Sequence, residues 1–388
     1  MKPDAFSIAH KIKANPAAEQ KQWMNLFCGH KRKAFNVLYD VESFWYRQAR
    51  NGLRPYPRKE DLYEELTRIK NIPEFAYLND APSDVLQRAV VDLWTGINKA
   101  RKRQANAPHH KRKDDYKQSF YISNEKGTIV YRGPKAFFKC PKLKKLCGND
   151  LIPLAEKPRF DGKIVSYNVT REGDNWFVTI AFELESNPHT CQNPDSVCGV
   201  DVGIGTPAIC SDGTELQMPD TSREEAKLRS YQAKMDRSRN ANGRRQHVSN
   251  RYKKTQKKFR ALQKRINNKR KDAIHKFTHE VTNNHGTVVV ETLNVTHIIR
   301  KMPGRGARRA AQRAGMGEVL RQLSYKAQRI EQAPWYYPSS QLCSSCGHRH
   351  PMPLDQRTYV CPHCGLELDR DLNAAINLAN YISQPGQG

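Results

Sequence analysis

Four cysteines near the C-terminus have the spacing of a metal site. They form two Cys-x-x-Cys pairs separated by fourteen residues, and a glycine directly follows each pair: Cys343, Cys346, Gly347, Cys361, Cys364 and Gly365. Each pair lets two thiolates reach one ion, and four thiolates complete the tetrahedral shell of Zn²⁺ without leaving a position open for catalysis. Redox-active pairs are the rival interpretation, which two pairs at this spacing do not favour. We therefore expect one structural zinc ion, with His348, His350 and His363 solvated nearby.

Acidic residues inside or beside apolar segments form a second group that could do chemistry. Asp201 lies inside an apolar stretch, and Glu291 ends a run of three valines. A buried carboxylate without a partner is costly, and a cation is one partner that it can take. Asp369 and Asp371 stand where an amphipathic helix begins, so one of them can face the same site. Either strand residue alone could be a hydrogen-bonding group at a strand end, but together with the helix start they indicate one converging set.

Three carboxylates around Mg²⁺ are what the hydrolysis of a phosphodiester needs. Mg²⁺ prefers oxygen ligands and keeps several of its waters. Two such ions about 4 Å apart activate a water and stabilise the leaving 3′ oxygen. Such a site requires no cysteine, serine or histidine nucleophile, so we expect two catalytic Mg²⁺ ions beside the structural zinc.

The charge of the chain indicates a polyanionic partner. Its 388 residues carry 66 Lys+Arg against 39 Asp+Glu, a net charge of +27. A membrane-surface, ribosomal or histone-like protein can be equally basic, but nucleic acid is the partner that such an excess favours most. The N-terminus has no apolar core of a signal peptide, and no apolar run is long enough to span a bilayer. The other cysteines are scattered, as expected in a reducing compartment, so we expect a cytoplasmic, nucleoid-associated protein.

The first half of the chain predicts strands around a helical block. Residues 6–14 alternate apolar and polar side chains as a strand does. Apolar residues recur at helical spacing from 17 to about 105, and a basic loop follows over 101–117. Strand-like segments including one β-hairpin return over 118–186. Residues 185–196, rich in Pro and Asn, predict a linker at the main domain boundary.

The second half begins with a predicted strand over 197–204 and a hairpin partner near 206–210. A helix start at Thr221 opens a basic helical hairpin, in which residues 221–284 hold twenty Lys/Arg against five Asp/Glu. A solvated hairpin is the alternative, but the apolar residues form only one stripe, so a phosphate-tracking face is favoured. The candidate phosphate contacts are Lys253, Lys254, Lys257, Lys258, Arg260, Lys264 and Arg265. Residues 383–388 predict a disordered tail.

Taken together, these motifs resemble the TnpB family of transposon-encoded, RNA-guided nucleases, which is related to the type V CRISPR effectors. The resemblance covers nearly the whole chain. Its most specific segments are GVDVGIGTPAICSDG, VVVETLNV, GEVLRQLSYKA, YPSSQLCSSCG and CPHCGLELDRDLNAAINL. It implies that Asp201, Glu291 and Asp371 are the catalytic, magnesium-binding residues. Asp371 is preferred to Asp369 because the family's aspartate stands two residues before the Asn of a D-x-N-A-A pattern.

The resemblance also implies an α+β multi-domain architecture. The expected parts are a wedge-type β-barrel (1–19 and 116–190) with a helical recognition insertion (20–115), an RNase H-like RuvC domain (197–340 and 368–382) and an inserted zinc ribbon (341–367). Arg305, Arg308 and Arg309 would lie in a lid-like segment near the nuclease site. The implied partners are a guide RNA and target double-stranded DNA, with the protein a monomer on the RNA and no membrane involved.

The implied activity is RNA-guided cleavage of DNA next to a short flanking motif, at a single RuvC-like site. A compact CRISPR-associated type V effector is the alternative with the same chemistry. A nuclease-inactive, RNA-guided DNA-binding repressor is a second alternative, which the intact carboxylates do not favour.

Overall fold

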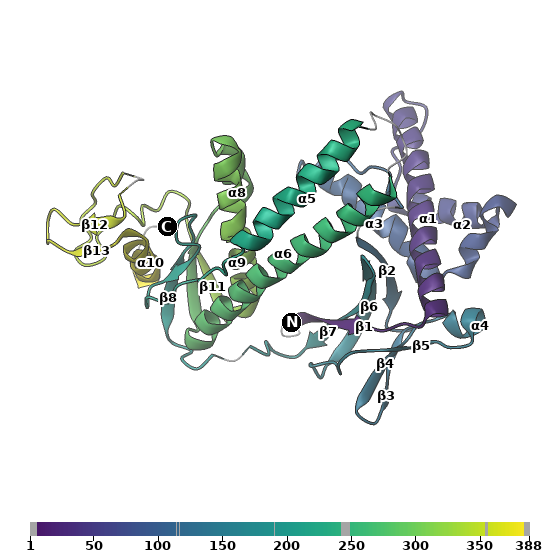
Figure 1. The fold of residues 1–388 in the computed structure, drawn as a ribbon, viewed down its shortest axis with the longest axis horizontal. Helices are drawn as coiled ribbons and strands as arrows, with labels where there is room; N and C mark the ends of the chain where they lie inside the picture. The colour runs from purple at the N-terminus through teal and green to yellow at the C-terminus, as the bar shows by residue number, and fades with distance from the viewer. Residues whose placement is uncertain are drawn as a thin grey trace. The chain divides into compact units, whose positions relative to one another are not determined.

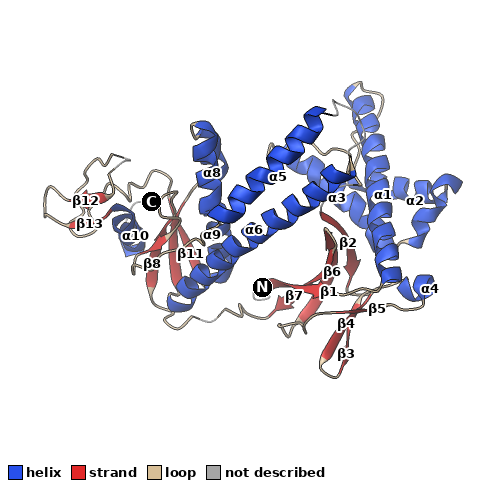
Figure 2. Ribbon diagram, in the orientation of Figure 1, coloured by secondary structure: helices blue, strands red, loops and turns tan. Residues whose placement is uncertain are grey.

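The computed structural model describes residues 6–113, 115, 117–189, 191–241, 249–353 and 356–383. The chain divides into two compact units, Met1–Ser186 and Asn187–Gly388. Figure 1 draws them as ribbons and labels many of their helices and strands. The division falls inside the segment for which the sequence predicts a linker. Both units contain helices and strands (Figure 2), so the fold is mixed α and β. Across the described ranges, none of the helices combines the length and the apolar composition that a bilayer crossing needs.

The first unit combines long helices with two antiparallel sheets. Its elements are β1 (Phe6–Ala14), α1 (Ala18–Arg50), α2 (Lys59–Asn71), the 3-10 helix η1 (Pro73–Asp80), α3 (Ser83–Arg101), β2 (Lys117–Ser123), β3 (Thr128–Arg132), β4 (Lys135–Lys139), α4 (Leu143–Cys147), β5 (Leu151–Pro153), β6 (Lys163–Glu172) and β7 (Asn175–Leu184). One sheet has the order β1-β7-β6-β2 and the other β3-β4-β5. A bridge between Ala14 and Leu154 joins the end of β1 to the segment after β5. Helices α1 and α3 pack on each other and on β2 around a common apolar core.

The main secondary-structure predictions for the first unit are confirmed. The strand 6–14 is β1, the helical stretch 17–105 contains α1 to α3, and the predicted hairpin is the pair β6–β7. Sequence periodicity missed β4, β5 and α4. These segments are only three to five residues long, which is too short for a hydrophobic period to be counted.

The second unit is built on a four-stranded sheet with helices on both faces. Its elements are β8 (Val197–Asp201), β9 (Ile209–Cys210), α5 (Ser222–Ala241), α6 (Asn250–Asn284), β10 (Thr287–Glu291), α7 (Val295–Lys301), α8 (Gly304–Ala314), α9 (Met316–Lys326), β11 (Arg329–Ala333), β12 (Thr358–Val360), β13 (Glu367–Asp369), α10 (Arg370–Asn380) and the 3-10 helix η2 (Tyr381–Ser383). The sheet order is β11-β10-β8-β9, with β8, β10 and β11 parallel and β9 antiparallel.

The valine run of β10 explains why both faces of this sheet are covered. Successive side chains of a strand point to opposite faces. Val288 and Val290 pack into the core shared with α6 and α9, whereas Val289 packs with Leu378 of α10 on the other side. A strand buried on both faces has a continuous apolar sequence rather than an alternating one. The helix that carries Asp371 is therefore held against the same sheet that carries the other carboxylates.

The strand predicted over 197–204 is too long. Strand β8 ends at Asp201, which still pairs with Ile209 of β9, whereas the pairing of β8 with β10 ends one residue earlier, at Val200. Gly203 and Gly205 follow, and glycine weakens a strand because it costs entropy and packs no side chain. The backbone therefore leaves the sheet directly after Asp201 and returns as the two-residue strand β9.

The basic helical hairpin is present as α5 and α6. Of its predicted apolar stripe, Tyr252, Ile266, Ile274 and Phe277 are buried. Lys269 bonds Glu224 across the two helices, and Arg270 bonds Glu225. At the other end of the unit, Ser383 of the predicted tail lies in η2, and 384–388 lie outside the described residues.

Candidate active site and metal centre

The three predicted catalytic carboxylates line one cavity. Asp201 is the last residue of β8 and Glu291 the last of β10. Because these strands are parallel and Val290 pairs with Val200, both carboxylates lie at the carboxyl edge of the sheet, where ligands of such sheets bind. Asp371 comes from the first turn of α10, which packs against β8. All three line a cavity of about 590 Å³.

Gly199 allows this close approach of helix and strand. A Cβ atom at this position would lie 2.0 Å from the carbonyl oxygen of Ala375 and 2.5 Å from the backbone nitrogen of Ala379. Real Cβ atoms do not approach a backbone that closely, because the cores of proteins are close-packed. The glycine two residues before Asp201 thus lets the backbone of α10 lie directly on β8.

The electrostatics of the cavity favour a cation. Burial, followed by the negative charges of Asp371 and Glu291, raises the pKa of Asp201 to about 7. Burial also raises the pKa of Glu291. Carboxylates that repel one another in a partly dry site are relieved by a bound cation. In the described part of the chain, the oxygens of the three carboxylates do not all lie within 4.8 Å of one another.

Asp369 and Asp371 have different environments. The Asp369 carboxylate accepts hydrogen bonds from the backbone N–H groups of Asp371 (2.9 Å) and Leu372 (3.0 Å), so it caps α10. Asp371 is 7% exposed and faces the cavity. Its carboxylate accepts hydrogen bonds from Arg357 (3.3 Å) and Arg370 (3.1 Å). Sequence reasoning did not single out these two arginines, because only the fold brings residue 357 to the cavity.

Two asparagines tie α10 to the cysteine segment. The Asn373 side chain donates to the carbonyl of Leu342 (2.7 Å) and accepts from the backbone of Ser344 (2.9 Å). The Asn377 side chain donates to the carbonyls of Ser339 (2.8 Å) and Leu342 (2.7 Å). Buried polar groups satisfied in this way fix a single arrangement. The position of Asp371 therefore depends on the segment that carries the first cysteine pair.

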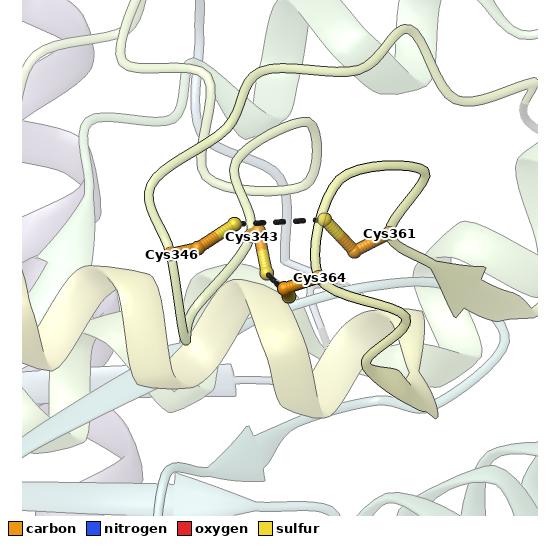
Figure 3. A group of neighbouring side chains, drawn as sticks. All are labelled: Cys343, Cys346, Cys361 and Cys364. Carbon is orange, nitrogen blue, oxygen red and sulfur yellow. Dashed lines mark hydrogen bonds between the residues drawn. The ribbon is translucent and has the colours of Figure 1, made fainter.

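The four predicted zinc ligands converge (Figure 3). Their side chains point toward one another, and all four sulfur atoms lie within 4.8 Å of one another. The Sγ atoms of Cys343 and Cys364 are 3.6 Å apart, as are those of Cys346 and Cys361. These distances are close to the edge of about 3.8 Å expected when four thiolates bind zinc at about 2.3 Å. The cluster therefore suits structural zinc.

Of the three histidines expected to be solvated beside the cluster, His348 and His363 are exposed and His350 is half-buried. Gly347 and Gly365 have φ values of +71° and +73°, the left-handed conformation that favours glycine. The rings of His348 and His363 stack on each other at 5.5 Å. Among the described residues, the ligand group contains the four cysteines and no histidine.

A second group of potential ligands was not predicted. Cys198 and Cys210 are twelve residues apart and were counted among the scattered cysteines. The pairing of β8 with β9 places their Sγ atoms 2.7 Å from each other in the core, with His285 close by. His285 bonds Ser196 (2.8 Å) and Asp212 (3.0 Å) through its two ring nitrogens. The contact with Cys210, together with burial, raises the pKa of the Cys198 thiol, which is therefore protonated. The predicted hairpin was the signal that could have revealed this pair.

The predicted phosphate contacts are mostly on the surface of α6 and α8. Eight of the ten side chains are exposed: Lys253, Lys254, Lys257, Lys258, Arg265, Arg305, Arg308 and Arg309. Arg260 and Lys264 are half-buried. Arg313, at the end of α8, bonds Glu225 of α5 and so joins the predicted lid segment to the basic hairpin.

Two protein families match the parts of the chain that carry the three carboxylates and the four cysteines. Residues 179–302, which include Asp201 and Glu291, match the family described as "Probable transposase" (OrfB_IS605). Residues 317–378, which include the four cysteines and Asp371, match the family described as "Cas12f1-like, TNB domain".

Curated relatives extend this similarity to nearly the full length. The chain is 27% identical to "Putative RNA-guided DNA endonuclease InsQ" of Escherichia coli K12, over 95% of this chain and 91% of the relative. It is also 27% identical to a "Putative RNA-guided DNA endonuclease" of Streptomyces pristinaespiralis, over 95% of this chain and 88% of the relative. "TnpB-like protein L79" of Acanthamoeba polyphaga mimivirus is 26% identical over 48% of this chain and 38% of the relative. The resemblance to the TnpB family is confirmed.

The fold of this TnpB-like chain also occurs in a solved structure. The protein in the "Cryo-EM structure of the Cas12f1-sgRNA-target DNA complex" matches it with a TM-score of 0.61, over 97% of this chain and 99% of that chain. The two sequences are 12% identical. The similarity to Cas12f1 therefore concerns the fold and not individual contacts.

Proposed function

We infer that this chain is an RNA-guided DNA endonuclease of an insertion sequence, which cleaves target DNA next to a short flanking motif. The observation that carries this proposal is the cavity at the carboxyl edge of the sheet. Asp201, Glu291 and Asp371, which come from three elements far apart in the sequence, line it together. The names of the full-length relatives and the net charge of +27 support nucleic acid as the substrate.

The proposal includes an assignment of parts. We assign the sheet β11-β10-β8-β9 with its helices, residues 197–340 and 368–382, to a single RuvC-like, RNase H-like nuclease domain. The zinc ribbon is 341–367. In the first unit, the two sheets are assigned to a wedge-type barrel and the helices of 20–115 to a recognition insertion. Helices on both faces of the parallel strands, and carboxylates at the strand ends, support the nuclease assignment.

Mg²⁺ fits the proposed site, with Asp201, Glu291 and Asp371 as its protein ligands. Bound there, two ions supply the activation of a water and the stabilisation of the leaving 3′ oxygen. Hard oxygen donors are the ligands that Mg²⁺ prefers. Burial and then the charges of Asp371 and Glu291 raise the pKa of Asp201, and a bound cation would offset both effects. Arg357 and Arg370 hold the third carboxylate at the cavity wall.

The nucleic acids are proposed to bind along the cationic helices. In this proposal, α6 and α8 track the phosphates of the guide RNA and of its duplex with target DNA, and the protein is a monomer on the RNA. Sequence would be read by base pairing with the guide, so the basic side chains need only recognise a backbone. A compact CRISPR-associated effector would share this arrangement. The gene's neighbourhood distinguishes the two, because a CRISPR effector lies beside a repeat array and a transposon protein lies between transposon ends. A nuclease-inactive repressor would need no intact carboxylate set.

The test is purification of the full chain co-expressed with its flanking DNA. A structured RNA should co-purify, and the complex should cleave a matching DNA in Mg²⁺. Asp201→Ala should abolish cleavage and leave target binding largely intact. Asp369→Asn is the matched control, because it removes one negative charge near the site but keeps a residue that caps a helix equally well. Cleavage by the Asp201 variant, or purification without RNA, would overturn the proposal.

A further inference from the structure

Two exposed aromatic side chains stand directly after strand β11. Trp335 is 77% exposed and Tyr336 is 68% exposed. The structure describes all five tryptophans of the chain, and Trp335 is the one that is exposed. Large aromatic side chains bury 150–250 Å² each when they are packed. Leaving two neighbouring rings in solvent therefore forgoes stabilisation, and a binding role is a reason to do so.

The backbone that presents these rings is fixed. The next residue, Tyr337, is buried, and its hydroxyl donates to the carbonyl of Asn377 (3.0 Å) in α10. Its ring packs edge-to-face on Tyr381 at 5.0 Å. A turn closes around the pair, because the N–H of Tyr337 donates to the carbonyl of Pro334 (2.9 Å). The exposed rings therefore belong to a segment anchored on the helix of Asp371.

Trp335 and Tyr336 form part of the wall of the carboxylate cavity. They line it together with Asp201, Glu291 and Asp371. The two rings meet edge-to-face with centroids 5.9 Å apart and planes at 85°, so they cannot stack on each other. Most of the surface of both residues is exposed, so it is available to a planar ligand.

The same cavity also offers cationic groups. Arg349 and Arg357 are among its lining residues. The Arg349 guanidinium is oriented by a hydrogen bond to the Gln341 side chain (3.1 Å), and Arg357 reaches Asp371. Aromatic faces beside guanidinium groups bind single-stranded nucleic acid, because bases stack on the rings while phosphates pair with the cations. A protein partner could also pack on the two rings, but the positive charges of the neighbouring arginines favour a ligand that carries phosphates.

We propose that Trp335 and Tyr336 form a stacking platform that binds an unpaired nucleobase of the DNA strand lying in the carboxylate cavity. The platform accepts any base, because every base has an aromatic face and stacking reads no hydrogen-bond pattern. It positions the strand and touches no reacting atom, so its loss should weaken substrate binding more than it slows chemistry. This inference rests on the proposed nuclease function.

The test compares Trp335→Ala, Tyr336→Ala and the conservative Trp335→Phe and Tyr336→Phe in the guide-loaded full chain. Stacking contributes about 1–3 kcal/mol per base, so each alanine variant should bind a single-stranded oligonucleotide about 5- to 150-fold more weakly. The affinity is measured in Ca²⁺ to prevent cleavage, and a 2-aminopurine base in the oligonucleotide should lose fluorescence when it stacks. In Mg²⁺, KM for single-stranded DNA should rise with kcat nearly unchanged, and the phenylalanine variants should recover most of the affinity. Tyr131→Ala, which removes a 56% exposed ring outside the cavity, is the matched control.

Each outcome separates this inference from the proposed function. A wild-type complex that cleaves no DNA would contradict the proposed function itself. If the wild-type complex cleaves and the alanine variants bind the oligonucleotide with unchanged affinity, the platform is wrong. It is also wrong if phenylalanine does not restore binding, or if kcat falls while KM stays the same. Unchanged zinc content and melting temperature show that a variant is folded.

Discussion

The carboxylate of Asp201 should make the metal-free protein less stable. Burial and the neighbouring negative charges raise its pKa from 3.8 to about 7. The folded protein then binds a proton more tightly than the unfolded chain does, so its stability falls as the pH rises from about 4 to about 7. Asp201→Asn keeps the shape of the side chain and removes the ionisation. We therefore expect this variant to be more stable than the wild type when no metal is bound.

The size of the effect follows from the two pKa values. Ionisation of Asp201 lowers the free energy of unfolding by about 4 kcal/mol at pH 8 and by about 2 kcal/mol at pH 5. For a folding unit of this size, each kcal/mol changes the melting temperature by about 2–4 °C. In a chelator, Asp201→Asn should melt about 8 °C or more above the wild type at pH 8, and about half of that above it at pH 5.

The assay is thermal melting of both proteins in excess chelator at the two pH values, repeated in Mg²⁺. A cation that binds the folded wild type stabilises it, by about 2.7 kcal/mol at a hundred times its Kd. The advantage of the asparagine variant should therefore shrink in Mg²⁺. Asp369→Asn is the control for net charge, with an expected change within about 0.5 kcal/mol because asparagine caps a helix as well as aspartate does.

Two results would refute this reasoning. If Asp201→Asn melts at the wild-type temperature at pH 8 in chelator, the folded protein does not disfavour the charge at this position. If its advantage is the same at pH 5 and pH 8, the stabilisation arises from packing or hydrogen bonding and not from ionisation.

Three further predictions concern the elements that place the third carboxylate. Asp371→Ala should abolish Mg²⁺-dependent cleavage, whereas Asp369→Ala should keep most of it and lose about 0.5–2 kcal/mol of stability through the missing cap; equal loss of cleavage in both would contradict the assignment. Cys361→Ser should reduce bound zinc from one ion per chain to less than one and lower the melting temperature, as measured by elemental mass spectrometry and calorimetry; a full zinc complement would argue against the four-cysteine site. Gly199→Ala should destabilise by about 1–3 kcal/mol or more, because the added methyl meets the backbone of α10. Its control is Gly317→Ala, where the methyl would meet nothing closer than 3.8 Å; equal denaturation midpoints for the two variants would show that α10 does not lie on β8.

Local sequence patterns predict those features of the site that involve residues close together in the chain. The spacing of Cys343 to Cys364 is enough to define a tetrahedral ligand set, because each pair of thiolates already sits on one turn. Glu291 after three valines predicts a carboxylate at the end of a buried strand. The apolar period after Asp371 predicts a helix that begins near Asp369. The structure agrees, because α10 begins at Arg370 and Asp369 is its N-terminal capping residue.

The remaining features depend on contacts between distant segments. The residues alone offer both Asp369 and Asp371, and the family resemblance prefers Asp371. The fold shows the physical difference, because Asp369 caps the helix and Asp371 lines the cavity. The pairing of Cys198 with Cys210 and the approach of Arg357 to Asp371 likewise arise from long-range packing. So does the exposure of Trp335, since an aromatic residue in a sequence predicts burial as readily as a binding surface.

Residue types and their spacing thus indicate which chemical groups this protein has: four thiolates for one ion, acidic residues within or beside apolar segments, and a cationic surface for a polyanion. Periodicity and ligand spacing are local properties, so no tertiary contact is needed to recognise them. Long-range packing sets which carboxylates share a cavity, which one caps a helix, and which aromatic rings stay exposed beside them. Those outcomes depend on how α10 packs on β8 at Gly199 and on the hydrogen bonds that tie it to the cysteine segment. Such contacts join residues far apart in the chain, and no local pattern encodes them.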